Sequence, residues 1–287
     1  MARSACFIQV KAFGDLVIAN AAANRVIEGE RARLTLAIGW HLRPLCNAIT
    51  PTIAMVELAT TETGVPSIFD VRKNGAAAAL RSAWQVRGAI AHGPIARDAL
   101  VLLDRLGARE RFLLGGRPAM GMPAGSANIY QGYDVLLADA GFALMPSPTG
   151  EIRGRRRAGI FPGSRIAAKN LPVQLVAALL DEAERRGVPT TLFLLDGERP
   201  DLEVSGLPHV IVPREFTALR DAIAGVDAVI SADSLPAHLA ETLRIDIFVL
   251  TPRPNEFWMP LSVFKHRRWC LFDDPKLLDR VGGLLAP

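Results

Sequence analysis

The sequence predicts an α/β protein built as two halves, each with a parallel sheet covered by helices. Short apolar runs of strand length alternate with longer stretches in which apolar residues recur at helical spacing. The alternation begins near residue 5, stops near residue 146 and starts again at residue 158. The chain has 287 residues, which suits two domains of roughly 100–200 residues each. We therefore expect domains at residues 1–150 and 151–287.

In the first half, each expected strand is a short apolar run bounded by polar or turn-forming residues. The expected strands are residues 5–10, 34–38, 53–58, 67–71 and 111–114. Helical spacing predicts helices at residues 16–27, 76–90 and 96–106. Because strands alternate with helices, the strands should form a parallel sheet with helices on both faces.

The second half repeats this pattern after a Pro-Ser-Pro-Thr-Gly segment at residues 146–150, which we interpret as a linker. The expected strands are residues 158–162, 190–195, 209–212, 227–232 and 245–250, and the expected helices are residues 171–186, 217–223 and 239–243. Parallel sheets of this kind bind ligands at the carboxyl ends of their strands. Two such halves should leave a cleft between them that faces those ends.

Composition limits the class of protein. With 50% hydrophobic and 22% charged residues the chain is globular, and its three cysteines form no Cys-x-x-Cys pair, which favours a reduced, cytoplasmic compartment. No secretory signal or membrane-spanning run of about 20 apolar residues is apparent. Much of the net charge of +4 lies in Arg153, Arg155, Arg156 and Arg157. This cluster is either a solvated segment or a site for an anionic substrate or membrane surface; without interleaved aromatic residues it does not favour nucleic acid.

Several motifs are missing from the sequence, and their absence excludes whole classes of enzyme. There is no Gly-x-Gly fingerprint for a dinucleotide, no Gly-x-x-x-x-Gly-Lys loop and no Gly-x-Ser-x-Gly nucleophile motif. There is also no Asp-x-Asp triplet, and the five histidines show no spacing typical of metal ligands. We therefore expect neither a bound cofactor nor a catalytic metal, and the chemistry should come from loops between strands and helices.

Three loops carry suitable residues. Asp233 and Ser234 end an apolar run and precede a helix, where free backbone N–H groups favour an anion, although an ordinary helix cap is the alternative. The segment from Gly163 to Lys169 combines hydroxyl, guanidinium and ammonium donors that suit phosphate, unless its cations only face water. Asp15 follows the first strand, where a carboxylate either interacts with the helix dipole or acts as a general base.

Taken together, these loops resemble motifs of glycosyltransferase family 9, which contains the ADP-heptose-using lipopolysaccharide heptosyltransferases. The stretch Asp-Ser-Leu-Pro-Ala-His at residues 233–238 is similar to the family's Asp-Ser/Thr-Gly-x-x-His motif. The Pro-Gly-Ser-Arg segment that starts at residue 162 is similar to a second family motif, and Gly14-Asp15 to a third. The three motifs keep the family's order across nearly the whole chain.

The resemblance implies a GT-B fold, with two Rossmann-like domains whose parallel sheets face a central cleft. It also implies inverting, metal-independent sugar transfer, with the acceptor in the first domain and the nucleotide-sugar donor, ADP-heptose or a relative, in the second. Asp15 falls at the position of the family's catalytic base. The positions that the resemblance assigns to the donor are Ser164, Arg165, Lys169, Glu215, Asp233, Ser234, Leu235, Pro236 and His238. The acceptor would be a saccharide of lipopolysaccharide or a related glycan, lipid-linked and anionic, at the inner membrane.

The main departure from the family pattern is Leu235, which stands where the family usually has Gly. A side chain there restricts how closely the backbone approaches a phosphate. Two alternatives therefore stay open: an inactive nucleotide-sugar-binding partner protein, and another nucleotide-sugar enzyme such as an epimerase.

Overall fold

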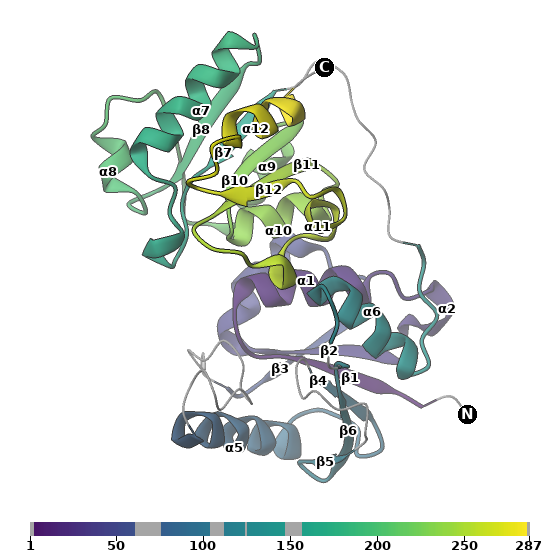
Figure 1. Cartoon of the computed structure of the whole chain (residues 1–287). Helices are drawn as coiled ribbons and strands as arrows, with labels where there is room; N and C mark the ends of the chain where they lie inside the picture. The colour runs from purple at the N-terminus through teal and green to yellow at the C-terminus, as the bar shows by residue number, and fades with distance from the viewer. Residues whose placement is uncertain (1–2, 61–75, 104–111, 124, 147–156, 286–287) are drawn as a thin grey trace. The chain divides into compact units, whose positions relative to one another are not determined.

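A computed structural model of the chain describes residues 3–60, 76–103, 112–123, 125–146 and 157–285. The strand expected at 67–71, most of the linker expected at 146–150, and Arg153, Arg155 and Arg156 lie outside the described residues. The chain divides into two compact units, Met1–Ser147 and Pro148–Pro287, here unit 1 and unit 2 (Figure 1).

The described residues of unit 1 form a six-stranded sheet in the order β3-β2-β1-β4-β6-β5, whose pairs are parallel except for that of β5 with β6. Its strands are β1 (Ala5–Gln9), β2 (Leu34–Gly39), β3 (Ala54–Leu58), β4 (Leu100–Leu103), β5 (Phe112–Leu114) and β6 (Arg117–Gly121). Its described helices are α1 (Phe13–Ala23), α2 (Glu28–Arg31), η1 (Trp40–Leu45), α3 (Cys46–Ile49), α5 (Ala76–His92) and α6 (Ile129–Asp139).

Both faces of the unit 1 sheet are covered. Successive side chains of a strand point to opposite faces, so neighbours in β1 serve different cores. Phe7 packs edge-on against Tyr133 of α6, with ring centroids 4.9 Å apart, whereas Ile8 belongs to a buried cluster that includes Ile90 of α5. Helices α1 and α6 therefore lie on one face and α5 on the other (Figure 1).

Unit 2 contains a second six-stranded sheet, in the order β12-β11-β10-β7-β8-β9, and all its pairs are parallel. Its strands are β7 (Ala158–Phe161), β8 (Thr190–Leu195), β9 (Val210–Val212), β10 (Ala228–Ala232), β11 (Asp246–Thr251) and β12 (Trp269–Leu271). Its helices are η2 (Ala167–Lys169), α7 (Val173–Arg185), α8 (Pro200–Glu203), α9 (Phe216–Ala224), α10 (Leu235–Thr242), η3 (Glu256–Trp258), α11 (Leu261–His266) and α12 (Leu277–Leu285). Its main core lies between the sheet and helices α7 and α12.

The α/β class and the two largely parallel sheets confirm the sequence prediction, but several elements differ from it. The sequence pattern did not predict β6, α6, β12 or α12. The helix expected at residues 96–106 is wrong, because Leu100–Leu103 form the buried strand β4. Helix α10 begins at Leu235 instead of residue 239, with Pro236 in its first turn. Proline is compatible with a first helical turn because no intrahelical partner awaits its missing N–H.

No helix in the part of the chain that the structure describes is both long and apolar enough to cross a membrane.

Candidate functional site

The candidate site of unit 2 lies where its strand order reverses. Strands β7 and β10 are neighbours, and the sequence-ordered strands run outward from them in opposite directions. In open parallel sheets, ligands bind beside the carboxyl ends of the strands at such a switch point. The loop after β7 leads to Lys169, and the loop after β10 contains Asp233 and Ser234. The fold thus brings together two of the three loops that the sequence singled out.

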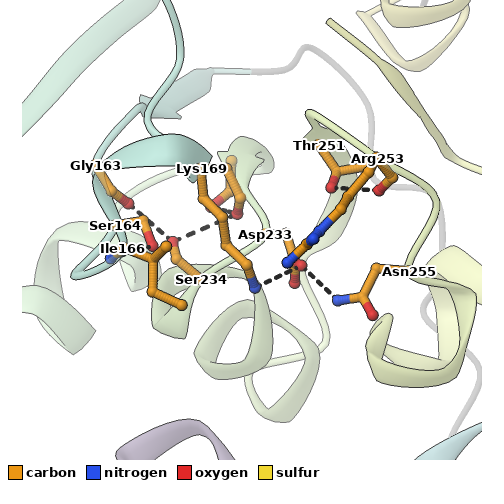
Figure 2. Close-up of polar contacts among 11 residues, drawn as sticks. Gly163, Ser164, Ile166, Lys169, Asp233, Ser234, Thr251, Arg253 and Asn255 are labelled. Carbon is orange, nitrogen blue, oxygen red and sulfur yellow. Dashed lines mark hydrogen bonds and ion pairs between the residues drawn. The ribbon is translucent and has the colours of Figure 1, made fainter. Parts of the chain in front are cut away.

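Asp233 is the centre of a polar cluster at this point (Figure 2). Its Oδ2 atom accepts hydrogen bonds from Nζ of Lys169 at 2.8 Å and from Nδ2 of Asn255 at 2.7 Å. The side chain of Asp233 is 4% exposed and that of Lys169 is 23% exposed. A buried carboxylate is stable only when paired and hydrogen-bonded, and these two donors meet that need. The ammonium of Lys169 is consequently held in place while part of it stays open to solvent.

Ser234 links the two loops. It occupies the N-cap position of α10, but its hydroxyl makes no capping bond and instead donates to the carbonyl oxygen of Gly163 at 2.9 Å. The next residue, Leu235, is half-buried at the first helical position. Pro236 has no amide hydrogen, so it contributes packing and no donor to the helix start. Of the first two residues of α10, only Leu235 therefore carries a backbone N–H.

The loop after β7 is shaped by its own hydrogen bonds. The backbone N–H of Ser164 donates to Oδ1 of Asn170 at 2.7 Å, and the N–H of Ile166 donates to Oγ of Ser164 at 3.2 Å. Arg165 is exposed at the tip of this loop. Arg199, a buried residue, donates to the carbonyl oxygens of Pro162 and Leu171 and so fixes both ends of the loop. The loop is a preformed structure that presents Ser164, Arg165 and Lys169.

Gly163 lies in close contact with Glu198. A Cβ atom at residue 163 would collide with the carboxyl group of Glu198, so only glycine fits there without movement. Burial raises the pKa of Glu198 above its usual range, and the nearby charges of Arg214 and Arg199 oppose that rise. The carboxyl group of Glu198 therefore forms one wall of the loop beside the Ser234 contact.

Replacing Gly163 with Ala should destabilise unit 2 by about 1 kcal/mol, at the low end for overpacking, because the atoms that the methyl group displaces are the carboxyl end of the flexible Glu198 side chain. The measurement is the midpoint of thermal unfolding. The control is Gly283→Ala in α12, where nothing lies within 4 Å of the added Cβ; it should be neutral or stabilising by up to about 1 kcal/mol. The double variant Gly163→Ala with Glu198→Ala should recover stability. If Gly163→Ala behaves like its control, the position of the Glu198 carboxyl group contributes nothing to stability.

His238 is buried in α10, near the Asp233 cluster. Burial lowers the pKa of His238 well below its usual range, with the positive charge of Lys169 adding to the effect and the carboxylate of Asp233 opposing it. The imidazole is therefore neutral at pH 7. A neutral ring can both donate and accept a hydrogen bond. Because it carries no charge, the local positive charge is that of Lys169.

Glu215 lies apart from the Asp233 cluster along the sheet. It is exposed at the N-cap of α9, which follows β9, and β9 is separated from β7 by the intervening strand β8. The backbone N–H of Glu215 donates to the carbonyl oxygen of Pro213. The other predicted donor residues of unit 2 follow β7 or β10. Glu215 instead follows β9, which pairs with β8.

Asp15 belongs to unit 1 and follows β1, at the point where the strand order of that sheet reverses between β1 and β4. It is buried in the first turn of α1, and its Oδ2 atom accepts a hydrogen bond from the backbone N–H of Ala12 at 3.3 Å. Nζ of Lys11 lies 3.6 Å from the same oxygen. The helix N-terminus and the ammonium both favour the charged carboxylate.

Sequence reasoning missed several residues that build the site. Asn255 holds Asp233, Asn170 holds Ser164, Arg199 fixes the loop ends and Glu198 packs on Gly163. Asn255 had a detectable signal, because it follows β11, the neighbour of β10, and so comes from a carboxyl end at the same sheet edge. The others act through contacts that no local pattern reveals.

Within the described ranges, no group of three or more His, Cys, Asp or Glu side chains is arranged to hold a metal ion.

Comparisons with known proteins bear on the fold. The chain matches no protein-family model and no curated protein sequence. Solved structures do match it. The glycosyl transferase family 9 protein from Veillonella parvula has a TM-score of 0.58 and 15% identity, over 94% of this chain and 86% of that chain. The E. coli ADP-heptose lipopolysaccharide heptosyltransferase II has a TM-score of 0.57 and 15% identity, over 97% and 98%.

The E. coli heptosyltransferase WaaC with ADP has a TM-score of 0.56 and 13% identity, over 93% of this chain and 92% of that chain. WaaC also matches when solved with ADP-2-deoxy-2-fluoro heptose. At identities this low, the similarity of the structures establishes the fold and nothing beyond it. The chain has the GT-B fold of these glycosyltransferases, as its motifs led us to expect.

Proposed function

We propose that this protein is an inverting, metal-independent glycosyltransferase that moves heptose from ADP-heptose to a saccharide acceptor of lipopolysaccharide or a related glycan. The observation that carries the proposal is the Lys169–Asp233 pair, tied to the helix start at Ser234, at the switch point of unit 2. Support for the donor comes from structures with the same fold that are named as ADP-heptose enzymes or hold ADP and an ADP-heptose analogue.

In this proposal residues 151–287 bind the donor. The diphosphate lies against the loop after β7 and the start of α10, where Ser164, Arg165 and Lys169 offer donors and the amide of Leu235 opens a helix. The carboxylate of Asp233, held by Lys169 and Asn255, accepts hydrogen bonds from sugar hydroxyls. The buried side chain of His238 helps to hold Asp233 in position, and Pro236 sets the backbone conformation of the first turn of α10. Glu215 borders the adenine through its main chain.

Residues 1–150 bind the acceptor, and Asp15 acts as the general base. Its carboxylate takes the proton from an acceptor hydroxyl while that oxygen attacks the anomeric carbon from the side opposite the leaving diphosphate, which inverts the configuration. Such a base must lie within about 3 Å of the hydroxyl oxygen. Nζ of Lys11 lies 3.6 Å from Oδ2 of Asp15, so the attraction between the two charges holds the carboxylate in position.

The negative charge that develops on the leaving ADP needs stabilisation. Lys169 and Arg165 carry positive charge, and the N-terminus of α10 adds a fixed dipole, so the chain itself supplies the preorganised donors. Each such donor contributes about 2.7–4 kcal/mol to transition-state stabilisation in well-studied enzymes. This is the physical reason for proposing transfer without a metal ion or other cofactor.

We also propose that the acceptor is anionic and lipid-linked, and that the protein acts in the cytoplasm in peripheral contact with the inner membrane. Support comes from the charge of the arginine cluster, of which Arg157 is described and exposed. Arginine suits a phosphorylated or carboxylated saccharide, and anionic lipid, because its guanidinium binds both groups in a bidentate way.

The test is a turnover assay with ADP-heptose and deacylated lipopolysaccharide core oligosaccharides, run with and without EDTA, alongside calorimetry with ADP. We expect ADP release that requires the oligosaccharide, survives EDTA, and gives a product of inverted anomeric configuration by NMR. ADP binding without turnover would indicate an inactive binding protein. Conversion of ADP-heptose without an acceptor would indicate an epimerase. A protein that does not bind ADP would contradict the proposed function.

A further inference from the structure

Three polar residues follow three neighbouring strands of unit 1. Lys11 follows β1, His41 follows β2, and Thr60 follows β3. In the register of the sheet Gly39 pairs with Leu58, so His41 and Thr60 are each two residues beyond the same level. All three residues therefore lie at the carboxyl edge of the sheet, the edge that also carries Asp15 and at which parallel sheets bind ligands.

The hydrogen bond between His41 and Lys11 fixes the tautomer of the imidazole. Nε2 of His41 lies 2.9 Å from the backbone carbonyl oxygen of Lys11. A carbonyl oxygen only accepts, so Nε2 carries the hydrogen, and in the neutral ring Nδ1 is left with a lone pair. That Nδ1 atom is buried and has no hydrogen-bond partner among the described residues. His41 thus presents a buried acceptor with a fixed direction.

Thr60 presents the complementary group. Thr60 is 3% exposed. Its Oγ1 atom is buried and has no hydrogen-bond partner among the residues that the structure describes. A Cβ atom on Gly39 would lie 2.9 Å from Nδ1 of His41 and 2.8 Å from Oγ1 of Thr60. The two unpartnered atoms therefore lie within 3 Å of one point beside Gly39, a point that a larger residue would occupy.

This pair lowers the stability of the protein, because each buried polar atom without a hydrogen-bond partner is unfavourable by about 1–3 kcal/mol. A single hydroxyl group would satisfy both, donating its hydrogen to Nδ1 of His41 while its oxygen accepts from the Thr60 hydroxyl. Saccharides carry many hydroxyl groups of this kind. Lys11 connects the pair to the proposed base, since its carbonyl bonds His41 and its ammonium lies 3.6 Å from Asp15.

We propose that His41 and Thr60 form a subsite that binds a hydroxyl group of the acceptor saccharide beside Asp15. The proposal rests on the proposed function and deepens it, by assigning acceptor recognition to two residues of unit 1. Both are positioning residues: they hold one acceptor hydroxyl so that another faces Asp15, and they take no part in proton transfer.

The test uses Thr60→Val, which keeps the shape of the side chain and removes the hydroxyl, and His41→Gln, whose amide nitrogen preserves the donor to the Lys11 carbonyl and removes Nδ1. The control is Thr35→Val, the same substitution nearer the amino end of β2. In the turnover assay each subsite variant should raise the KM for deacylated core oligosaccharide roughly three- to tenfold, the worth of one hydrogen bond, with an unchanged KM for ADP-heptose.

A second measurement separates the subsite from the reaction. Saturation-transfer NMR reports oligosaccharide binding directly, so it applies even if ADP-heptose is not turned over and the proposed function fails. The wild-type protein and Thr35→Val should bind the oligosaccharide equally, and the two subsite variants several-fold more weakly. Equal binding by Thr60→Val and the wild type, which is expected if the pair holds only a water molecule, overturns the proposal. So does a wild-type protein that binds no oligosaccharide.

Discussion

Asp15→Asn is expected to lower turnover of ADP-heptose by about 10²- to 10⁴-fold, the usual contribution of a general base. The amide keeps the shape of the carboxylate and still accepts the hydrogen bond from the N–H of Ala12, so the start of α1 should persist. What it loses is the negative charge and the ability to take a proton. The affinity for ADP should be unchanged, because the proposed donor residues lie in unit 2.

Loss of stability is the competing explanation for a fall in turnover. The side chain of Lys11 is only 2% exposed, and Asp15→Asn removes a carboxylate 3.6 Å from its ammonium. Breaking a buried pair in this way costs about 3–5 kcal/mol. The double variant Lys11→Met with Asp15→Asn also removes the charge of Lys11, so its thermal midpoint should lie nearer that of the wild type while turnover stays low. Asp98→Asn, at an exposed residue of unit 1, is the matched control. Near-normal turnover by Asp15→Asn would exclude Asp15 as the base.

The main features of the fold could be predicted because hydrophobic periodicity is a local property. Strands β1, β2 and β8 are buried or half-buried runs bounded by polar residues, and they lie where the sequence pattern predicted them. In a parallel sheet, strand positions also fix which loops lie at the carboxyl edge. Which loops meet there also depends on strand order: the loops of Lys169 and Asp233 meet because β7 pairs with β10, a neighbourhood that the resemblance to known glycosyltransferases led us to expect.

The errors arose where periodicity is ambiguous. Strand β4 is four buried apolar residues, Leu100–Leu103, and a short continuous apolar run fits a strand or one turn of a buried helix equally well. The flanking residues favoured the helix, and only pairing with β1 and β6 decides for the strand. Contacts between distant residues are a second limit. The donation from Ser234 to Gly163 and the packing of Glu198 on Gly163 depend on how three loops meet, which no single segment encodes.

Lys169→Met should weaken ADP binding by about 10- to 100-fold, the effect of losing hydrogen bonds and charge worth roughly 1.5–3 kcal/mol. It should also destabilise unit 2, because the carboxylate of Asp233 is 4% exposed and its Oδ2 atom would keep, of its two described side-chain donors, that of Asn255. Because the side chain of Lys169 is 23% exposed, water can partly replace its ammonium beside Asp233. We therefore expect a loss of about 2–3 kcal/mol in the free energy of unfolding, at or below the low end for a broken buried pair. The measurements are calorimetry with ADP and the thermal unfolding midpoint.

Adding Asp233→Asn to Lys169→Met separates the two roles of the lysine. The second change removes the unpaired charge, so the thermal midpoint should return toward that of the wild type. ADP affinity should stay low, because no ammonium faces the diphosphate. Lys276→Met, at an exposed lysine of the same unit, controls for the change in net charge and should leave both measurements unchanged. Recovery of ADP affinity together with stability in the double variant would mean that Lys169 serves only to neutralise Asp233. The diphosphate would then have to be bound by the loop after β7 and the start of α10 alone.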